Sequence, residues 1–287
     1  MTKILVTGAN GQLGKALQEV LKNEEVLFTD VEEMDITDKQ ATEDVFNTFK
    51  PTILIHGAAY TDVDGCEENP ELARKINANG TESLAEACKK HNCQMIYIST
   101  DYVFDGTKKE PYLEEDKTNP QSVYGKTKLE GEKYALGLKN SYIVRTSWIY
   151  GEGKNFVRTM LALSEKMDEI KVVNDQFGRP TYALDLAKAI YDIIKKQPEP
   201  GIYNVTGDGR LISWADFAQE IFKITGRKTK VVGISTEEYL SQYPDKKIAP
   251  RPAYSVLNLS ITKKNIRILT WEKGLKTFLK QETSRTG

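Results

Sequence analysis

A glycine-rich turn between an apolar strand and a helix, within the first 22 residues, restricts the fold of this chain more than any other feature. Residues 3–7 form a short β-branched run, and residues 12–22 repeat apolar side chains at helical spacing. The turn between them, TGANGQLG, carries Gly8, Gly11 and Gly14. Glycines at such positions permit a tight turn, a close approach of the backbone to a pyrophosphate, and close packing of helix on strand. This GxxGxxG turn, which follows a strand and opens a helix, predicts a dinucleotide-binding α/β domain.

The alternation of strand and helix patterns continues as far as residue 150. Short β-branched runs predict strands, and amphipathic stretches predict helices. The predicted strands are 3–7, 26–29, 52–56, 95–99 and 142–145, and the predicted helices are 12–22, 39–49, 70–90 and 122–138. Strands that alternate with helices imply a parallel sheet with right-handed crossovers. The expected fold class is therefore α/β, with a Rossmann-type doubly wound parallel sheet.

The rhythm changes after Gly151. The predicted elements are a helix at 155–166, a strand at 170–173, a polar loop at 175–181, a helix at 184–195, a strand at 202–205, a helix at 214–225, a strand at 231–232 and a helix at 272–281. The strongly apolar helix 184–195 is expected to pack back on the first sheet. We therefore expect a nucleotide-binding domain over 1–150, completed near 183–206. Residues 151–182 and 207–287 are expected to form a smaller C-terminal α/β substrate lobe.

Composition excludes several classes of protein. The 287 residues are 39% hydrophobic and carry a formal net charge of −1, so no basic excess points to nucleic acid or to an anionic membrane surface. No apolar run approaches the roughly 20 residues of a membrane span. The N-terminus resembles no signal peptide, and three cysteines without a CxxC pair fit reduced thiols, so we expect a cytoplasmic protein. With two histidines, a histidine-rich zinc site is not expected.

A carboxylate after the second strand bears on the choice of cofactor. Asp30 follows that strand about 20 residues beyond the glycine turn, where it can accept a hydrogen bond from an adenosine ribose 2′-hydroxyl. No arginine stands nearby to bind a 2′-phosphate, and Glu32 and Glu33 should repel one. The alternative is that Asp30 only caps a loop. The pattern favours NADH over NADPH, with Asp35 and Ile36 beside the adenine ring.

Three polar side chains form a candidate catalytic group. Tyr124 and Lys128 stand four residues apart on a predicted helix, which places both on one face. A nearby positive charge favours the phenolate form of tyrosine and should lower its pKa. Thr100 directly follows the fourth predicted strand, at the sheet edge where ligands bind in such folds. A hydroxyl there can reach the same carbonyl oxygen as Tyr124, so the three residues are predicted to reduce a carbonyl group.

Four further segments narrow the family. They are STDYVFDG (99–106), RTSWIYG (145–151), DQFGRPT (175–181) and RPAYSVL (251–257). The glycine turn and the Tyr-x-x-x-Lys spacing resemble the extended short-chain dehydrogenase/reductase superfamily, and these segments resemble its dTDP-4-dehydrorhamnose reductase family, from Ile4 to about Trp271. The resemblance implies reduction of the C4 ketone of dTDP-4-dehydro-L-rhamnose by NADH or NADPH. The product would be dTDP-L-rhamnose, in the last step of dTDP-rhamnose biosynthesis for cell-surface polysaccharide.

The resemblance implies a role for each matching residue. Tyr124 would donate a proton to the developing alkoxide, Lys128 would lower the pKa of Tyr124 and hold the nicotinamide ribose, and Thr100 would hydrogen-bond the sugar oxygen. The implied cofactor set is Gly8, Asn10, Gly11, Gln12, Leu13, Gly14, Asp30, Asp35, Ile36, Ala59, Tyr60, Thr61, Tyr124 and Lys128. The implied substrate set is Thr100, Asp101, Trp148, Asn155, Arg179 and Arg251, the last three meeting the thymidine diphosphate. The residues alone leave two alternatives open, namely that Trp148 is a core aromatic and that the arginines form surface ion pairs.

One position departs from the family. Some members carry a magnesium ion at a dimer contact, with a glutamate two residues after the third glycine among its ligands. Here that position is Ala16. We therefore expect no metal. The resemblance implies a homodimer, which here would lack the contact through the metal. The expected partner is a dTDP-linked 4-keto-6-deoxy sugar, with no nucleic acid and no membrane.

Other functions stay open from the sequence. A non-catalytic, NAD(P)-binding regulatory subunit of methionine adenosyltransferase resembles this family and would bind cofactor without turnover. The complete set of Thr100, Tyr124 and Lys128 argues against that alternative. Another nucleotide-sugar reductase or an epimerase would share the scaffold, and an epimerase would retain its NAD+ through many cycles. A dehydratase typically needs a carboxylate pair after the Thr100 position, whereas Asp101 is followed here by Tyr102.

Overall fold

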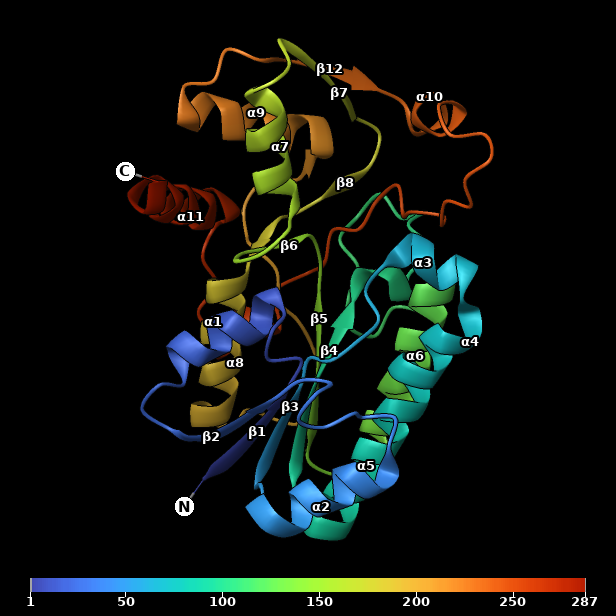
Figure 1. The fold of residues 1–287 in the computed structure, drawn as a ribbon, viewed down its shortest axis with the longest axis vertical. Coiled ribbons are helices and arrows are strands. Elements are labelled where there is room, and N and C mark those ends of the chain that lie inside the picture. The colour runs from blue at the N-terminus through green and yellow to red at the C-terminus, as the bar shows by residue number, and fades with distance from the viewer. Residues whose placement is uncertain (1, 287) are drawn as a thin grey trace.

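A six-stranded parallel sheet forms the centre of the chain, in strand order β10–β5–β4–β3–β1–β2 (Figure 1). The computed structural model describes the backbone of residues 2–286 and the side chains of residues 2–284. The strands are β1 (Lys3–Thr7), β2 (Glu25–Thr29), β3 (Ile53–His56), β4 (Gln94–Thr100), β5 (Ser141–Thr146) and β10 (Gly201–Asn204). Every neighbouring pair in this sheet is parallel. The order and direction of the strands confirm the predicted doubly wound α/β fold class.

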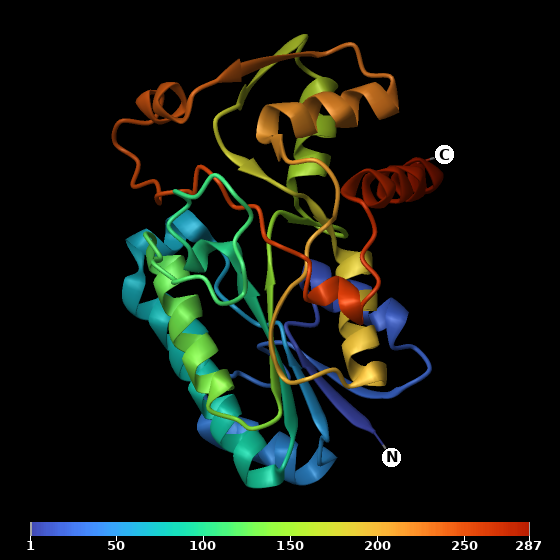
Figure 2. The same cartoon turned by 180° about the vertical axis from the view of Figure 1, so that it is seen from behind.

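Helices cover both faces of the sheet, as right-handed crossovers require (Figures 1 and 2). One face carries α1 (Gln12–Val20) and α8 (Ala183–Lys196). The other face carries α2 (Lys39–Phe49), α5 (Thr81–His91) and α6 (Val123–Leu136). The pattern over 70–90 predicts one continuous helix. The structure confirms a helical segment there, in which α4 (Pro70–Arg74) continues through a π-helical turn (Lys75–Gly80) into α5.

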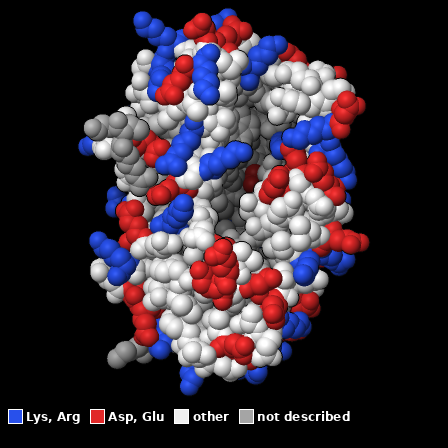
Figure 3. Space-filling model, in the orientation of Figure 1, with Lys and Arg blue, Asp and Glu red and all other residues white. Residues whose placement is uncertain are grey.

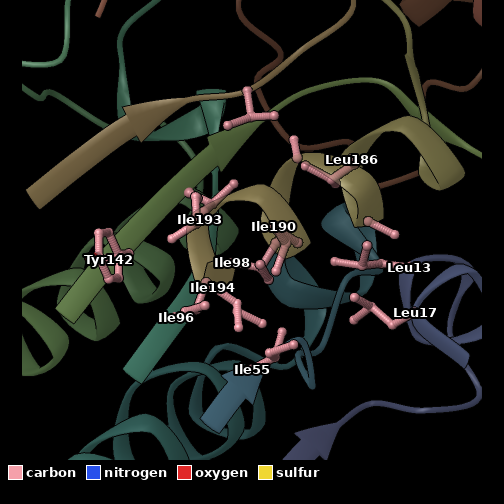
Figure 4. Packing of buried hydrophobic residues seen from close by; sticks show 14 of the residues in the cluster. Leu13, Leu17, Ile55, Ile96, Ile98, Tyr142, Leu186, Ile190, Ile193 and Ile194 are labelled. Atoms are coloured by element: carbon pink, nitrogen blue, oxygen red, sulfur yellow. The ribbon is translucent and has the colours of Figure 1, made fainter. Parts of the chain in front are cut away.

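The apolar cluster under α1 and α8 fixes the glycine turn on the sheet. Leu13 and Leu17 of α1 pack with Ile190 of α8 against Ile96 and Ile98 of β4 (Figure 4). The intervening side chains of β4 belong to the cluster on the opposite face, as the two-residue period of a strand requires. Burying one such side chain stabilises a fold by about 1.5–3 kcal/mol. The cluster therefore holds the N-terminal end of α1 against the carboxyl end of β1.

A smaller group of elements lies beyond the carboxyl ends of the sheet strands, at the top of Figure 1. It has its own apolar cluster, to which α7, α9 and α11 contribute. Its elements are α7 (Phe156–Ser164), β7 (Glu169–Val173), β8 (Phe177–Gly178), β9 (Thr181–Tyr182), β11 (Ile212–Ser213), α9 (Trp214–Thr225), β12 (Lys230–Ile234), α10 (Thr236–Ser241) and α11 (Trp271–Thr286). Because α8 and β10 return to the main sheet, these contacts support the interleaved division into two domains, which stays a proposal.

Several short elements carry no sequence periodicity and are not predicted. These are α3 (Val63–Glu68), β6 (Ile149–Tyr150), β8, β9, β11 and α10. Of these, β8 and the first residue of β9 lie in the segment 175–181, which is predicted to be a polar loop. Strands of two residues are shorter than the window from which a period can be read. None of the helices in the described part of the chain combines the length and the apolar character that a membrane crossing needs.

Gly131 determines how closely α6 approaches the sheet. A Cβ atom at this position would lie 2.3 Å from the Tyr97 hydroxyl oxygen and 2.8 Å from the backbone oxygen of Asn77. Both neighbours are buried, so they have little room to move. The missing side chain therefore lets α6 lie directly on β4.

We predict that Gly131→Ala lowers the free energy of unfolding by about 1–3 kcal/mol, because it overpacks this contact. The loss should occur although alanine is the better helix former. Gly137 at the end of α6 is the control, since its Cβ would come no closer than 3.2 Å to the Tyr134 backbone oxygen. Gly137→Ala should change the free energy by less than about 0.5 kcal/mol. Urea unfolding followed by circular dichroism measures both, and an equally stable Gly131→Ala variant would contradict this account.

Candidate active site

A cavity of about 710 Å³ opens at the carboxyl ends of the sheet strands. Its wall is formed by the glycine turn, the residues that end β1, β2, β4 and β5, and the first turns of α6. It spans the point between β1 and β3 where the strand order reverses, the place where doubly wound sheets bind ligands. Figure 3 shows this side of the molecule hollowed between its upper and lower parts, with basic and acidic side chains on the rim. The volume suits a ligand of cofactor size.

The glycine turn has the geometry that a pyrophosphate site needs. Gly8 has a φ of +74°, and a Cβ there would lie 2.7 Å from the Ala58 backbone nitrogen. A Cβ on Gly14 would lie 2.3 Å from the Gly8 backbone oxygen. Gly11 is the N-cap residue of α1, and no side chain accepts a hydrogen bond there. The first backbone N–H groups of the helix therefore remain available to donate to a ligand. Such a helix N-terminus binds phosphate groups.

The residues predicted to hold the adenosine end lie together at one end of the cavity. Asp30, Asp35 and Ile36 all line its wall. The Asp30 carboxylate accepts hydrogen bonds from the backbone nitrogens of Asn10, at 2.8 Å, and Val31, at 2.9 Å. Asp30 therefore also ties the glycine turn to the end of β2. Among the described residues that line the cavity, Lys128 is the one basic side chain, and it belongs to the other end.

Two caps direct the start of α6 toward the cavity. The Ser122 hydroxyl accepts a hydrogen bond from the Gly125 backbone nitrogen at 3.1 Å, and the Glu67 carboxylate accepts one from Val123 at 2.6 Å. Tyr124 and Lys128 then follow on one face, and both line the cavity. The helix that was expected from the Tyr-x-x-x-Lys spacing is thus present, with both side chains facing the ligand space.

Thr100 and Asp101 lie on the same wall, at the end of β4. The Thr100 hydroxyl donates to the Asp101 carboxylate at 3.0 Å. Asp101 is 3% exposed, and its Oδ2 has no hydrogen-bond partner among the described residues. Burial raises the pKa of Asp101 to about 6. A carboxyl group with one uncommitted oxygen therefore stands beside the predicted proton donor.

The prediction of a lowered tyrosine pKa is wrong. Burial raises the pKa of Tyr124 above its ordinary value, although the nearby Thr100 hydroxyl opposes this shift. Lys128 is itself buried, with 3% exposed and its Nζ 4.1 Å above the centre of the Tyr97 ring. Burial lowers the pKa of Lys128 to about 7, against the opposing charge of Glu132. At neutral pH Tyr124 therefore keeps its proton, and Lys128 is near the midpoint of its titration.

A buried ion pair holds α6 on the sheet behind Lys128. Arg145 of β5 donates to Glu132 through Nε at 2.9 Å and through Nη2 at 2.8 Å. The Ser99 hydroxyl donates to the same carboxylate at 2.5 Å. Removing one partner of a buried pair leaves an uncompensated charge and costs about 3–5 kcal/mol. The pair therefore fixes the helix that carries Tyr124 and Lys128.

Trp148 follows β5 and lines the cavity in an unusual backbone conformation. Its φ is +49°, which is sparsely populated by bulky residues and often marks a functional position. Its ring stacks on Trp214, with centroids 3.6 Å apart and planes 8° from parallel. Gly178 makes room for the ring, since a Cβ there would lie 2.6 Å from it. Trp148 is thus clamped by residues of the upper part of the molecule.

Some predicted site residues lie away from the cavity wall. Tyr60 is outside it, although its neighbours Ala59 and Thr61 line it. Asn155 caps α7, where its amide donates to the backbone oxygens of Gly151 and Gly153. The other two predicted site residues away from the wall are Arg179 and Arg251.

The two arginines beyond the wall differ in their contacts. Arg251 forms an ion pair of 2.9 Å with Asp64 of α3. Arg179 donates to the Leu257 backbone oxygen at 3.3 Å, while its buried Nε has no partner among the described residues. Their roles as ligands of the diphosphate stay predictions.

The sequence patterns missed part of the wall. The missed lining residues include Ser99, Tyr102, Thr146, Ser147 and Ile149. Thr146 ends β5 just as Thr100 ends β4, and the two are paired in the parallel register. The equivalent positions of Thr100 and Thr146 follow from the ends of the predicted strands. The described residues contain no group of three or more His, Cys, Asp or Glu side chains that could hold a metal ion, and the expectation of no metal stays a prediction.

Comparisons with known proteins show which family this chain resembles over nearly its whole length. Residues 1–284 match the family model described as the RmlD substrate binding domain. The chain is 41% identical over 296 residues to the dTDP-4-dehydrorhamnose reductase of Aggregatibacter actinomycetemcomitans, covering 97% of this chain and 98% of that protein. It superposes on the crystal structure of a dTDP-4-dehydrorhamnose reductase from Clostridium acetobutylicum with a TM-score of 0.93 and 46% identity, covering 98% and 100% of the two chains. The Bacillus anthracis dTDP-4-dehydrorhamnose reductase in complex with NADP gives a TM-score of 0.92 and 40% identity, with the same coverage.

The buried Lys128 makes a prediction about pH. Its pKa is about 7 in the fold and 10.5 in its ordinary state, so between these values the unfolded chain binds more protons. Stability from this group therefore rises with pH over that window, and the full cost of burial is present below it. We predict that Lys128→Met is more stable than the wild type near pH 6.5, by roughly 2–4 kcal/mol, since each pKa unit corresponds to about 1.4 kcal/mol.

The advantage of Lys128→Met should shrink as the pH rises to about 9, because the wild-type lysine then loses its proton in the fold. Urea unfolding at a series of pH values measures the difference. Lys126→Met, on the exposed side of the same helix, is the control and should show no such trend. A pH-independent difference for Lys128→Met would mean that Lys128 is not titrating in this range.

Proposed function

Because the chain belongs to the dTDP-4-dehydrorhamnose reductase family, described as the RmlD substrate binding domain, we propose that it reduces the C4 ketone of dTDP-4-dehydro-L-rhamnose to dTDP-L-rhamnose. It is an NAD(P)H-dependent oxidoreductase that performs the last step of dTDP-rhamnose biosynthesis. One observation carries the proposal. Thr100, Tyr124 and Lys128 lie together on the wall of a cavity whose other end is the glycine turn.

The proton is supplied by Tyr124. A nicotinamide cofactor bound in the cavity would supply a hydride to C4, and the substrate oxygen would take the phenolic proton of Tyr124 as the C–O double bond becomes single. Burial keeps this phenol protonated at neutral pH, which suits a proton donor. The phenolate left behind is stabilised by the Lys128 ammonium, which also holds the nicotinamide ribose. The phenolate regains its proton from solvent before the next turnover.

Thr100 and Asp101 orient the sugar. The Thr100 hydroxyl, which donates to Asp101 within the fold, would turn its proton to the substrate C4 oxygen when the sugar binds, and the Asp101 Oδ2 would accept a hydrogen bond from a neighbouring sugar hydroxyl. Trp148, held by its stacking on Trp214, forms the side of the sugar site. Donors aimed at developing negative charge are among the largest contributions to catalysis.

Arg179 and Arg251 are proposed for the diphosphate. A guanidinium suits phosphate because it offers a planar fork of donors. Arg179 has an uncommitted buried Nε, whereas Arg251 would have to share its charge with Asp64. The case for Asn155 is weaker, because its amide and its Oδ1 are already used in capping α7.

We also propose a cytoplasmic location and, following the family, a homodimer.

The proposed function predicts consumption of NADH or NADPH when the protein is given dTDP-4-dehydrorhamnose. Tyr124→Phe should lower turnover by about 10²–10⁴-fold, because it removes the proton donor. It should bind NADH nearly as the wild type does. Loss of absorbance at the nicotinamide band measures turnover, and fluorescence titration measures binding.

Three outcomes would contradict parts of this account. A wild-type protein that consumes neither cofactor with this sugar is not the reductase. Cofactor binding without turnover would favour the regulatory-subunit alternative. Equal turnover by wild type and Tyr124→Phe would remove Tyr124 as the proton donor, while leaving the reductase assignment intact.

NADH is the proposed preferred cofactor. The support is the Asp30 carboxylate at the adenosine end and the lack of a basic side chain beside it among the lining residues that the structure describes. The Bacillus anthracis relative was solved in complex with NADP. Both cofactors must therefore be measured.

We predict that Asp30→Ala raises the kcat/KM ratio of NADPH to NADH by roughly tenfold, because a negative charge next to a 2′-phosphate is removed. Asp30→Asn is the matched variant, since it removes the charge but keeps an oxygen that can accept from the Asn10 nitrogen. Both variants should shift the ratio. An unchanged ratio in Asp30→Asn, with poorer use of both cofactors by Asp30→Ala, would mean that Asp30 only holds the turn.

A further inference from the structure

Four strands of the sheet end in threonine at the cavity wall. They are β1 with Thr7, β2 with Thr29, β4 with Thr100 and β5 with Thr146. All four side chains are buried. This repetition allows the four hydroxyl groups to be compared in equivalent positions.

Three of these hydroxyls are committed to neighbours within the protein. Thr7 is 2.8 Å from the His56 ring nitrogen Nδ1. Thr29 donates to the Val6 backbone oxygen at 3.1 Å. Thr100 donates to Asp101 at 3.0 Å. Each of these hydroxyls therefore has a role inside the fold.

Thr146 is the exception. It is 3% exposed, and its hydroxyl has no hydrogen-bond partner among the residues that the structure describes. The next hydroxyl along the chain, on Ser147, instead donates to the Arg179 backbone oxygen at 3.2 Å. A buried hydroxyl without a partner costs free energy, so one that faces a ligand cavity calls for an explanation.

The position of Thr146 identifies the part of the ligand that it meets. The adenosine end of the cavity lies at β2, beside Asp30, and the glycine turn follows β1. Thr100 and Thr146 are register partners on β4 and β5, at the opposite end. A cofactor that extends from Asp30 to Tyr124 must bring its nicotinamide ring to this end. The polar group on that ring is a carboxamide, which can donate and accept hydrogen bonds.

We propose that the Thr146 hydroxyl hydrogen-bonds the carboxamide of the nicotinamide ring and so sets which face of the ring is turned toward Thr100 and Tyr124. The inference rests on the proposed function, because it requires a nicotinamide cofactor. The ring can rotate about its bond to the ribose, and rotation by half a turn exchanges its two faces. A hydrogen bond to the carboxamide distinguishes these orientations, whereas contacts to the ribose and phosphates do not.

The test compares ligands with and without the nicotinamide ring. Thr146→Val keeps the shape of the side chain but removes the hydroxyl, and Thr146→Ser keeps the hydroxyl. We expect Thr146→Val to bind NADH about 3- to 10-fold more weakly, the range for one net hydrogen bond, and to bind ADP-ribose as the wild type does. Thr146→Ser should stay within about twofold of the wild type for both ligands. Isothermal titration calorimetry measures all of these affinities without turnover.

Thr42 of α2 provides a matched control. Its hydroxyl is also buried and without a partner among the described residues, but it does not line the cavity. Thr42→Val should therefore leave the binding of NADH and of ADP-ribose unchanged. Both valine variants should be at least as stable as the wild type without ligand, because each removes an unpaired buried hydroxyl. Thr146→Val alone should show a smaller rise in Tm on adding NADH.

Unchanged NADH affinity in Thr146→Val would overturn the inference, and so would an equal loss for ADP-ribose, which would indicate a general distortion of the cavity. Unchanged cofactor binding with a raised KM for the sugar would assign the hydroxyl to the substrate instead. If the wild-type protein itself bound neither NADH nor NADPH, the proposed function would fail, which is a different result from failure at Thr146.

Discussion

The buried pair between Arg145 and Glu132 is the interaction on which the site depends. It joins β5 to the middle of α6, and the Ser99 hydroxyl adds a bond from β4 to the same carboxylate. Successive side chains of a strand point to opposite faces. Ser99 and Arg145 therefore hold the helix, while the side chains of the next residues along the two strands, Thr100 and Thr146, lie on the opposite face of the sheet and line the cavity, whose wall Ser99 also reaches. The same two strand ends thus anchor the catalytic helix and present hydroxyls to the ligand, so the relative position of Tyr124 and those hydroxyls is fixed by the sheet itself.

This anchoring brings Lys128 into a nearly dry environment, with consequences for both stability and chemistry. Glu132 is shared with Arg145 and is neutralised by it, so only part of its field remains to favour a protonated Lys128. Burying a lysine whose pKa is about 7 costs free energy of folding at neutral pH. The same lysine readily takes up a proton and becomes charged when a phenolate forms beside it. The arrangement is typical of active sites, where groups are held in environments that shift their pKa values and the fold bears the cost. Burial raises the pKa of Tyr124 and lowers that of Lys128, so the spacing of the two residues on the helix does not predict the direction of the shift at Tyr124.

The sequence predicts those parts of the site that depend on local pattern. The glycine turn, the carboxylate after β2 and the spacing of Tyr124 and Lys128 lie within single strand–helix units, and all of them reach the cavity. The sequence pattern does not reveal the other contacts of these side chains within the fold. Asn155 caps a helix within its own segment, and Arg251 meets Asp64 nearly 190 residues earlier in the sequence, so their roles toward a ligand stay predictions. The role of Thr146 was missed for a different reason, because a threonine at the end of a strand is unremarkable until the partners of the other three strand-end threonines are known.

Trp148 connects the two halves of the molecule at the ligand space. Its left-handed backbone conformation turns the chain out of the sheet two residues after Thr146, and its ring is then held between Gly178 and Trp214, which belong to the upper part. A bulky residue keeps such a conformation only where the surroundings determine it strongly. The sheet therefore fixes the hydroxyl of Thr146 at one end of this short turn, while the upper part fixes the aromatic ring at the other. Any shift of the upper part relative to the sheet must alter the distance between these two groups, so the side of the sugar site formed by Trp148 depends on how the two halves pack, whereas the face formed by Thr100 and Tyr124 does not.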